Sequence, residues 1–258
     1  MTNTPALQLT QVSKTFISKE RAVQALSPID LTVQRGEFVC FLGASGCGKS
    51  TLLSIIAGLE PASGGTIVAE GVEVRGTGID RVMMFQDAAL FPWLTVQGNV
   101  EFALKQQGIP RRERAELART WIERVRLGGF ENSPVHQLSG GMRQRVALAR
   151  SLAVDPAVLL MDEPFGALDA LTRDRLHLEL ESLWSATRKT ILFVTHNVRE
   201  AVALGDRVLV FSPRPGRVVG EFTIDLPRPR SLEDVTVIAE AAKVMAVLRE
   251  ALGDAGDE

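Results

Sequence analysis

Eight consecutive residues near the N-terminus have the composition of a phosphate-binding loop. They are Gly43, Ala44, Ser45, Gly46, Cys47, Gly48, Lys49 and Ser50, with Thr51 next in the chain. Glycines in such a loop allow backbone N–H groups to turn toward phosphate oxygens, and a following helix N-terminus adds partial positive charge. Lys49 is predicted to reach the β- and γ-phosphates, and the Ser50 hydroxyl to bind Mg²⁺. A glycine-rich turn with a chance Lys-Ser pair is disfavoured, because an apolar strand precedes the loop and a helical segment follows it.

Two carboxylates follow an unbroken apolar strand later in the chain. The strand covers residues 158–161 and is followed by Asp162 and Glu163. Such a run is typical of a central strand that is buried on both faces. Asp162 is predicted to orient Mg²⁺ through water, and Glu163, which points differently, to polarise an attacking water. The alternative, two solvated acids at a strand end, is disfavoured by the phosphate-binding loop upstream.

A Leu-Ser-Gly-Gly turn lies between these two motifs. It consists of Leu138, Ser139, Gly140 and Gly141, and it precedes a predicted helix with Met142, Val146 and Leu152 on one face. Ser139 has the residue type of a helix N-cap. By itself, that structural role explains the serine.

The segments that must position these motifs predict an α/β fold. Residues alternate in polarity over 7–12 and 29–33, which is typical of antiparallel strands, and a buried strand follows at 37–42. The further predicted elements are a helix at 51–57, hairpin strands at 66–69 and 72–74, strands at 81–85, 158–161, 190–194 and 207–211, and helices at 142–152, 168–184 and 198–204. Strands alternating with helices of this length imply a mostly parallel sheet covered on both faces, with a ligand beyond the carboxyl ends of the strands.

Two segments are predicted to be helical outside this alternation. Residues 95–127 have a helical pattern that is interrupted at 108–110, and the expected buried stripe is Val100, Leu104, Leu117, Trp121 and Val125. The tail from Ser231 is expected to form a docked amphipathic helix before an acidic end. Its expected buried stripe is Val235, Ile238, Ala242, Met245 and Leu248.

Composition limits the classes of partner. The 258 residues include 29 Lys and Arg against 31 Asp and Glu, so no excess positive charge is available for nucleic acid. Cys40 and Cys47 are too few for a disulfide scaffold, which favours a reducing cytoplasm, and Cys47 is interpreted as a small side chain in the loop rather than as a redox switch. Residues 1–5 do not read as a secretory signal. The longest apolar runs fall far short of the roughly 20 residues of a membrane-spanning helix, so a membrane role would require a partner.

The order of the three motifs resembles the ABC ATPases, and the resemblance extends over nearly the whole chain. It implies ATP and Mg²⁺ as ligands and a P-loop NTPase fold with an N-terminal antiparallel β-subdomain. Residues 1–230 would form the ATP-binding domain, with a RecA-like core and a helical subdomain at about 95–153, and residues 231–258 the C-terminal helix and tail. It also implies a homodimer through the ATP sites. Ser139, Gly140 and Gly141 match a turn of that family. In the family, this turn faces the γ-phosphate bound on another subunit.

Four further residues match positions of the family. Phe16 resembles the aromatic that stacks on adenine, and Gln86 the glutamine of the Q-loop, a further metal position. Asp169 resembles the D-loop aspartate, and His196 the switch histidine, which with Lys49 would stabilise charge on the γ-phosphate. Considered singly, the four could be a core aromatic, a surface amide, an N-cap and a satisfied strand-end histidine.

Three residues near these positions do not follow the family pattern. His136 and His177 match no motif and are interpreted as structural or surface residues. Asn197 stands where the family often has Asp, which removes a charge close to the expected γ-phosphate contact.

Two segments, 84–96 and 211–218, are similar to the ATPase subunits of nitrate, sulfonate and taurine importers. The first includes the loop that receives a coupling helix of the membrane subunit in that family. Phe91, Pro92 and Trp93 would form an apolar landing site there; alternatively, Trp93 belongs to the core. The resemblance implies integral-membrane permease partners, an extracytoplasmic solute-binding protein as an indirect partner, and a position at the cytoplasmic face of the cell membrane.

Two alternatives remain at this level. One is an ABC subunit for another transported solute. The other is a soluble ABC ATPase in DNA repair or translation, which is disfavoured because the helical insert is short, no second nucleotide domain follows and no basic tract is present.

Overall fold

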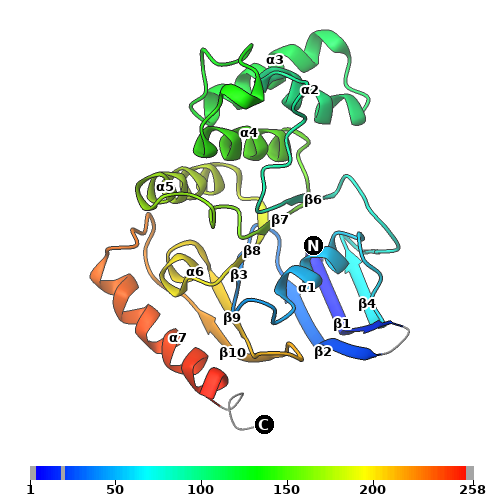
Figure 1. The fold of residues 1–258 in the computed structure, drawn as a ribbon, viewed down its shortest axis with the longest axis vertical. Coiled ribbons are helices and arrows are strands. Elements are labelled where there is room, and N and C mark those ends of the chain that lie inside the picture. Colours follow the sequence, from blue (N-terminus) through cyan, green and yellow to red (C-terminus); the bar gives the residue numbers. More distant parts are fainter. Residues whose placement is uncertain (1–3, 19–20, 254–258) are drawn as a thin grey trace.

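Two β-sheets form the body of the protein, and the computed structural model describes residues 4–18 and 21–253. The larger sheet has six strands in the order β10-β9-β3-β8-β7-β6, and the smaller has four in the order β2-β1-β4-β5. The strands are β1 (Leu7–Ile17), β2 (Ala22–Val33), β3 (Phe38–Leu42), β4 (Gly64–Ala69), β5 (Val72–Glu73), β6 (Arg81–Met84), β7 (Val158–Asp162), β8 (Thr190–Thr195), β9 (Arg207–Phe211) and β10 (Val218–Thr223). The helices are α1 (Lys49–Ile56), α2 (Val96–Gln106), α3 (Arg111–Arg124), α4 (Gly140–Ala153), α5 (Ala170–Thr187), α6 (Val198–Leu204) and α7 (Val235–Gly253), with a 3-10 turn at Val135–Gln137. Figure 1 shows α2, α3 and α4 gathered at one end of the molecule.

Five neighbouring strands of the larger sheet run parallel, so their carboxyl ends meet at one edge. Leu42 of β3 pairs with Thr195 of β8, and Asp162 of β7 pairs with Val194. The residues that follow these strands therefore come together. This register confirms the predicted mostly parallel sheet and places its ligand edge.

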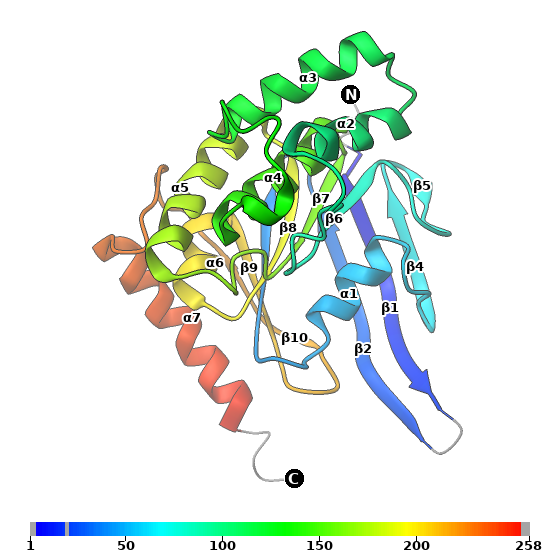
Figure 2. The same cartoon turned by 45° about the horizontal axis from the view of Figure 1, so that its top comes forward.

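The larger sheet is covered on both faces, as predicted. Along β3, Phe38 and Cys40 pack with the helices on one face, whereas Val39 and Phe41 pack with α1 and the smaller sheet on the other. This alternation follows from the two-residue period of a strand. Figure 2 shows α1 lying between the two sheets. In the smaller sheet, β1 pairs antiparallel with β2 and β4, which confirms the expected antiparallel subdomain.

The helical subdomain is confirmed, but one of its predicted buried residues is wrong. Leu117 is 38% exposed, whereas Ala118 and Ile122 are fully buried. The chain breaks before Pro110, the N-cap of α3, so the two helices do not share one continuous phase. A stripe extended from α2 into α3 is consequently displaced by one residue, about 100° around the helix.

The C-terminal helix α7 is docked as predicted, but through a different face. Val237, Ala241, Val244 and Leu248 are buried, whereas Val235 is 81% exposed and Ile238 and Ala242 are also exposed. Apolar residues occur on both faces of α7, so periodicity alone did not select the buried one.

A buried arginine anchors the segment that leads into α7. The Arg230 guanidinium donates to the carbonyl oxygens of Val202 (3.0 Å), Gly205 (2.6 Å) and Ile224 (3.0 Å), and its backbone N–H donates to the Glu181 carboxylate. These contacts hold the segment that leads into α7 against the end of α6. The expected acidic tail, 254–258, and residues 1–3 of the N-terminal segment lie outside the described residues. Within the described part of the chain, each helix is too short or too polar to cross a membrane.

Candidate functional site

The phosphate-binding loop connects β3 to α1, and its lysine is held beneath it. Lys49 is 4% exposed, and its Nζ donates to the carbonyl oxygens of Gly43 and Ala44, each at 2.8 Å. Gly48 has φ +98°, and a Cβ there would lie 2.6 Å from the Leu26 side chain, so the loop requires glycine at this position. Cys47 is buried, with Sγ 3.6 Å from the Lys49 Nζ. A preorganised cation under a turn of backbone N–H groups suits a nucleotide phosphate.

Ser50 and Asp162 meet across the sheet edge. The Ser50 hydroxyl donates to Asp162 Oδ1 at 2.8 Å. Burial raises the pKa of Asp162, and neighbouring Glu163 raises it further, while the Ser50 hydrogen bond and the charge of Lys49 oppose the shift. A hydroxyl and a carboxylate are oxygen donors of the kind that Mg²⁺ binds beside phosphate and water, so these residues fit the predicted ion.

Glu163 and His196 form the second polar pair of the edge. Glu163 has φ +43°, an uncommon conformation for a residue with a side chain, and its N–H donates to the Val194 carbonyl at 3.1 Å. Its Oε2 lies 2.9 Å from His196 Nδ1. Glu163 thus contacts His196, whereas Asp162 contacts Ser50, so the two carboxylates have different partners.

A buried network supports the backbone on either side of His196. The Thr195 hydroxyl donates to Glu200, whose other carboxylate oxygen contacts His177 Nε2. Asn197 accepts hydrogen bonds from the backbone N–H groups of Arg199 (3.0 Å) and Glu200 (3.3 Å), so it caps α6. His177 is therefore a buried structural residue. His136, by contrast, is exposed.

A cavity of about 430 Å³ opens above the phosphate-binding loop. Nine of the predicted site residues line it, namely Phe16, Ser45, Gly46, Gly48, Lys49, Ser50, Thr51, Gln86 and Glu163. Phe16 is 42% exposed at this cavity, so it is not a core aromatic. Its position suits stacking on a bound base.

The Leu-Ser-Gly-Gly turn and Asp169 do not line this cavity in their own chain. The Ser139 side chain accepts from the Met142 N–H at 3.3 Å and caps α4, and Asp169 accepts from the Thr172 N–H at 3.0 Å and caps α5. Hydrogen bonding from Thr172 lowers the pKa of Asp169. Both side chains therefore perform the ordinary capping role that residue type alone suggested. Ser139 thus lies outside the cavity above the phosphate-binding loop of its own chain.

Comparison with known proteins identifies the family. The family model described as ABC transporter matches residues 26–166, more than half of the chain. This chain belongs to the ABC transporter family. The match confirms the predicted resemblance to the ABC ATPases, and the cassette is an ATP-binding, ATP-hydrolysing subunit.

Relatives of the cassette agree with the predicted importer class. It is 51% identical over 221 residues to the nitrate import ATP-binding protein NrtD of Synechocystis sp., covering 86% of this chain and 83% of that protein. It is 50% identical over 218 residues to the taurine import ATP-binding protein TauB of Burkholderia pseudomallei, covering 84% of each.

Solved structures agree with the predicted fold class. A dimeric ATP-binding cassette in a post-hydrolysis state, bound to ADP and Pi, superposes with a TM-score of 0.76 at 32% identity and covers 86% of this chain and 100% of that one. CbiO1 of Clostridium perfringens, part of the CbiONQ ABC transporter complex, has a TM-score of 0.76 at 25% identity, with 94% of each chain covered.

Two side chains that no sequence motif indicated hold the loop of Gln86. Gln144, 5% exposed, donates from Nε2 to the Gln86 carbonyl at 2.8 Å. Arg150 donates to the carbonyls of Ala88 (3.0 Å) and Ala89 (2.8 Å). Both come from α4 of the cassette. In the sequence, Gln144 could have been singled out as a polar residue among the apolar residues on the buried side of an amphipathic helix.

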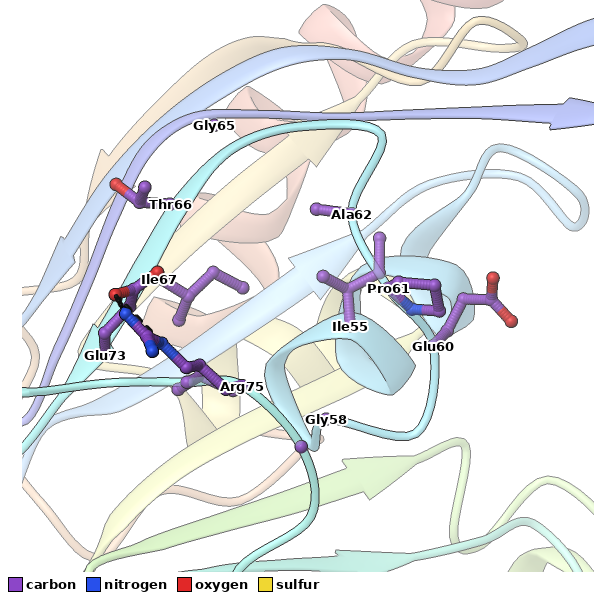
Figure 3. Close-up of a pocket in the computed structure, with 12 residues that line it drawn as sticks. Ile55, Gly58, Glu60, Pro61, Ala62, Gly65, Thr66, Ile67, Glu73 and Arg75 are labelled. Atoms are coloured by element: carbon purple, nitrogen blue, oxygen red, sulfur yellow. Dashed lines mark hydrogen bonds and ion pairs between the residues drawn. The ribbon is translucent and has the colours of Figure 1, made fainter.

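A second cavity of about 430 Å³ lies between the end of α1 and the β4–β5 hairpin. Figure 3 shows that its charged residues lie on opposite sides of apolar Ile55, with Glu73 and Arg75 on one side and Glu60 on the other. Glu60 accepts from Lys14, and Arg75 pairs with Glu73 at 2.9 Å. These charges are satisfied within the protein, and no predicted site residue of the cassette lies in this cavity.

Proposed function

We propose that two copies of this cassette bind MgATP between them, and that hydrolysis energises import of nitrate, taurine, an alkanesulfonate or a related small solute. The observation that carries the proposal is the convergence of Lys49, Ser50 and Glu163 on one cavity at the carboxyl edge of the sheet, where Ser50 also donates to Asp162. The names of the relatives in the comparisons support the importer class.

Each residue at the edge has a distinct role in this proposal. Backbone N–H groups of the loop from Gly43 to Thr51 hold the phosphates, and Phe16 stacks on the adenine. Ser50, Asp162 and Gln86 would hold Mg²⁺, which would neutralise charge on phosphate oxygens. Together, these groups place fixed positive charge and hydrogen-bond donors where negative charge develops in the reaction.

Glu163 acts as the base in the reaction. Its carboxylate accepts a proton from a water that attacks the γ-phosphorus, while the bond to the β–γ bridging oxygen breaks and ADP leaves. Lys49 and His196 stabilise the negative charge on the transferred phosphoryl group. The contact between Glu163 and His196 supports this arrangement, because it keeps both groups at the same point of the edge.

The active site is completed by a second copy arranged head to tail. Ser139, Gly140 and Gly141 at the start of α4, together with Asp169, would then face the γ-phosphate held by the other copy's loop. The dimeric state of the ADP- and Pi-bound neighbour supports this arrangement. Closure of the dimer would displace the loop of Gln86.

An exposed aromatic surface supports a membrane-subunit partner. Trp93 is 77% exposed, which contradicts its assignment to the core. Its ring centroid lies 5.5 Å from that of Phe91, which in turn lies 4.4 Å from Phe102. This aromatic surface, at the end of the loop of Gln86, suits contact with a helix of an integral-membrane permease at the cytoplasmic face of the membrane. A solute-binding protein outside the cell would act through that permease.

Substitution of Glu163 tests the hydrolytic role. Glu163→Gln removes the base but keeps the size of the side chain, so we expect phosphate release to fall by at least about 100-fold with ATP affinity little changed. The variant should accumulate as an ATP-bound dimer in size-exclusion chromatography. Glu240→Gln on α7 is the matched control and should hydrolyse ATP normally. Normal turnover by Glu163→Gln would remove this residue from the role of base.

Growth of a deletion strain tests the importer class. We expect defects on nitrate, taurine or alkanesulfonates as nutrients, restored by the wild-type gene and not by Glu163→Gln. A defect confined to an unrelated nutrient would favour the alternative, a subunit for another solute.

A further inference from the structure

The turn between β9 and β10 brings a second cation to the nucleotide cavity. Arg214 lines the same cavity as Lys49 and Phe16. Its Nη2 lies 3.4 Å from the carbonyl oxygen of Gly46, in the middle of the phosphate-binding loop. The segment around Arg214 is similar to importer ATPase subunits, and the turn itself needs only proline and glycine there.

The turn between β9 and β10 packs against β2 and against the phosphate-binding loop. The Gly216 N–H donates to the Ala25 carbonyl and the Ser27 N–H to the Gly216 carbonyl, each at 2.9 Å. A Cβ at Gly216 would lie 2.0 Å from the carbonyl oxygen of Cys47, so the backbones of the turn and the loop are in contact. The position of the Arg214 backbone relative to the loop is therefore determined by packing rather than by a free hairpin.

The two cations of the cavity differ in how they are held. Lys49 is buried and engaged with two carbonyl groups. Arg214 is exposed, and among residues 4–18 and 21–253 its guanidinium makes the single Gly46 contact. A guanidinium has five N–H donors in a planar fork that matches a phosphate group. Most of the Arg214 donors therefore remain available to a ligand.

We infer that Arg214 is a further nucleotide-binding residue, which contacts a phosphate of the bound nucleotide from the side of Gly46. The inference rests on the proposed ATP site. Backbone groups in the middle of such a loop face the α- and β-phosphates, whereas the lysine reaches the β- and γ-phosphates. Arg214 thus binds the part that ATP and ADP share, and it acts on affinity rather than on the chemical step.

Titration with fluorescent ATP and ADP analogues tests this role. Arg214→Ala should raise the Kd of both nucleotides by a similar factor, about tenfold at low salt, because a charge-assisted hydrogen bond is lost. The KM for ATP should rise by more than kcat falls. The Kd of the variant should also depend less on salt, and Arg214→Lys, which keeps the charge, should recover part of the affinity.

Arg217→Ala provides the matched control, since Arg217 is exposed on the same turn and does not line the cavity. Its nucleotide affinity should equal that of the wild type. Unchanged Kd values for Arg214→Ala, or the same change in Arg217→Ala, would overturn the inference. Lys49→Ala distinguishes failure of the Arg214 role from failure of the proposed ATP site. If Lys49→Ala loses nucleotide binding while Arg214→Ala does not, only the role of Arg214 is wrong. If Lys49→Ala retains nucleotide binding, the proposed ATP site itself is wrong.

Discussion

Asp162 is subject to opposing demands at the residue scale. In the proposed site it would have to be ionised to hold Mg²⁺, yet burial raises its pKa and therefore disfavours the charged form in the folded protein. The Ser50 hydroxyl and Lys49 offset this effect only in part. A charged carboxylate at this position therefore lowers the stability of the nucleotide-free protein, while it serves ligand binding.

Neutralising Asp162 should stabilise the nucleotide-free protein. A raised folded-state pKa means that the stability contribution of this group is present below the unfolded-state pKa and is lost as the pH rises through the folded-state pKa. Asp162→Asn avoids that loss and can still accept from Ser50. We expect its Tm to exceed that of the wild type by a few degrees near neutral pH, and the difference to shrink toward about pH 4.

Thermal unfolding in EDTA, without nucleotide, measures this effect across the pH range. Asp174→Asn on the exposed side of α5 is the control and should show no such trend. The same Asp162→Asn protein should lose Mg²⁺-dependent hydrolysis. A lower Tm for Asp162→Asn at neutral pH would contradict the argument.

At the element scale, α4 connects two parts of the site that are separated in sequence. Its N-terminus is the turn capped by Ser139, and its buried side holds the loop of Gln86 through Gln144 and Arg150. Ala89 in that loop has φ +44°, an unfavourable backbone conformation for alanine. Hydrogen bonds from Arg150 therefore maintain a loop conformation that its own residues do not favour.

Removing the Arg150 guanidinium should loosen the loop. Arg150→Met leaves the carbonyls of Ala88 and Ala89 without these donors and removes the cation that lies 5.6 Å from the Phe91 ring centroid. We expect a loss of about 2 kcal/mol in unfolding free energy and faster hydrogen exchange at residues 86–91. Arg119→Met, on the exposed side of α3, should change neither quantity. Faster exchange spread evenly over the chain, rather than at this loop, would argue against a local clamp.

At the scale of the whole molecule, the proposed active site is divided between two surfaces. The nucleotide cavity lies at the carboxyl edge of the larger sheet, whereas Ser139 lies at the exposed start of α4 and does not line that cavity. A head-to-tail pair would bring each Ser139 to the other copy's Lys49. A Lys49 defect on one copy and a Ser139 defect on the other would then fall on the same site of a mixed dimer and leave its other site intact.

Mixing two inactive variants should therefore restore hydrolysis. Lys49→Ala removes the phosphate contact, and Ser139→Asp preserves the helix cap but brings a negative charge to the phosphate. In a heterodimer, one site carries both defects and the other carries neither. Random mixing should give about a quarter of the wild-type activity if each site acts independently, because half of the dimers have one intact site.

Phosphate release from purified variants, alone and mixed, measures the effect. Ser139→Asn, which keeps a neutral cap, should retain more activity than Ser139→Asp. A mixture as inactive as its components would count against an active site shared between copies.

The local sequence determined the family, the chemistry and most of the elements of this protein. Glycine spacing, a two-sided apolar strand and capping residues are properties of neighbouring residues, so the loop at Lys49, the acids at the end of β7 and the helix at Ser139 can be predicted without knowledge of the fold. The helix α6 and the strand β9 were predicted with their observed bounds, 198–204 and 207–211.

Tertiary structure decided which faces are buried and which distant residues meet. The phases of α3 and α7 were wrong by about one residue, because each helix offers more than one apolar row and the choice depends on what it packs against, such as the segment anchored by Arg230. Gln144 and Arg150 contact a loop some 60 positions earlier in the chain, and Arg214 contacts Gly46 across 168 positions. Contacts of this kind arise from the register of the sheet and the packing of its covering layers, which no local pattern encodes.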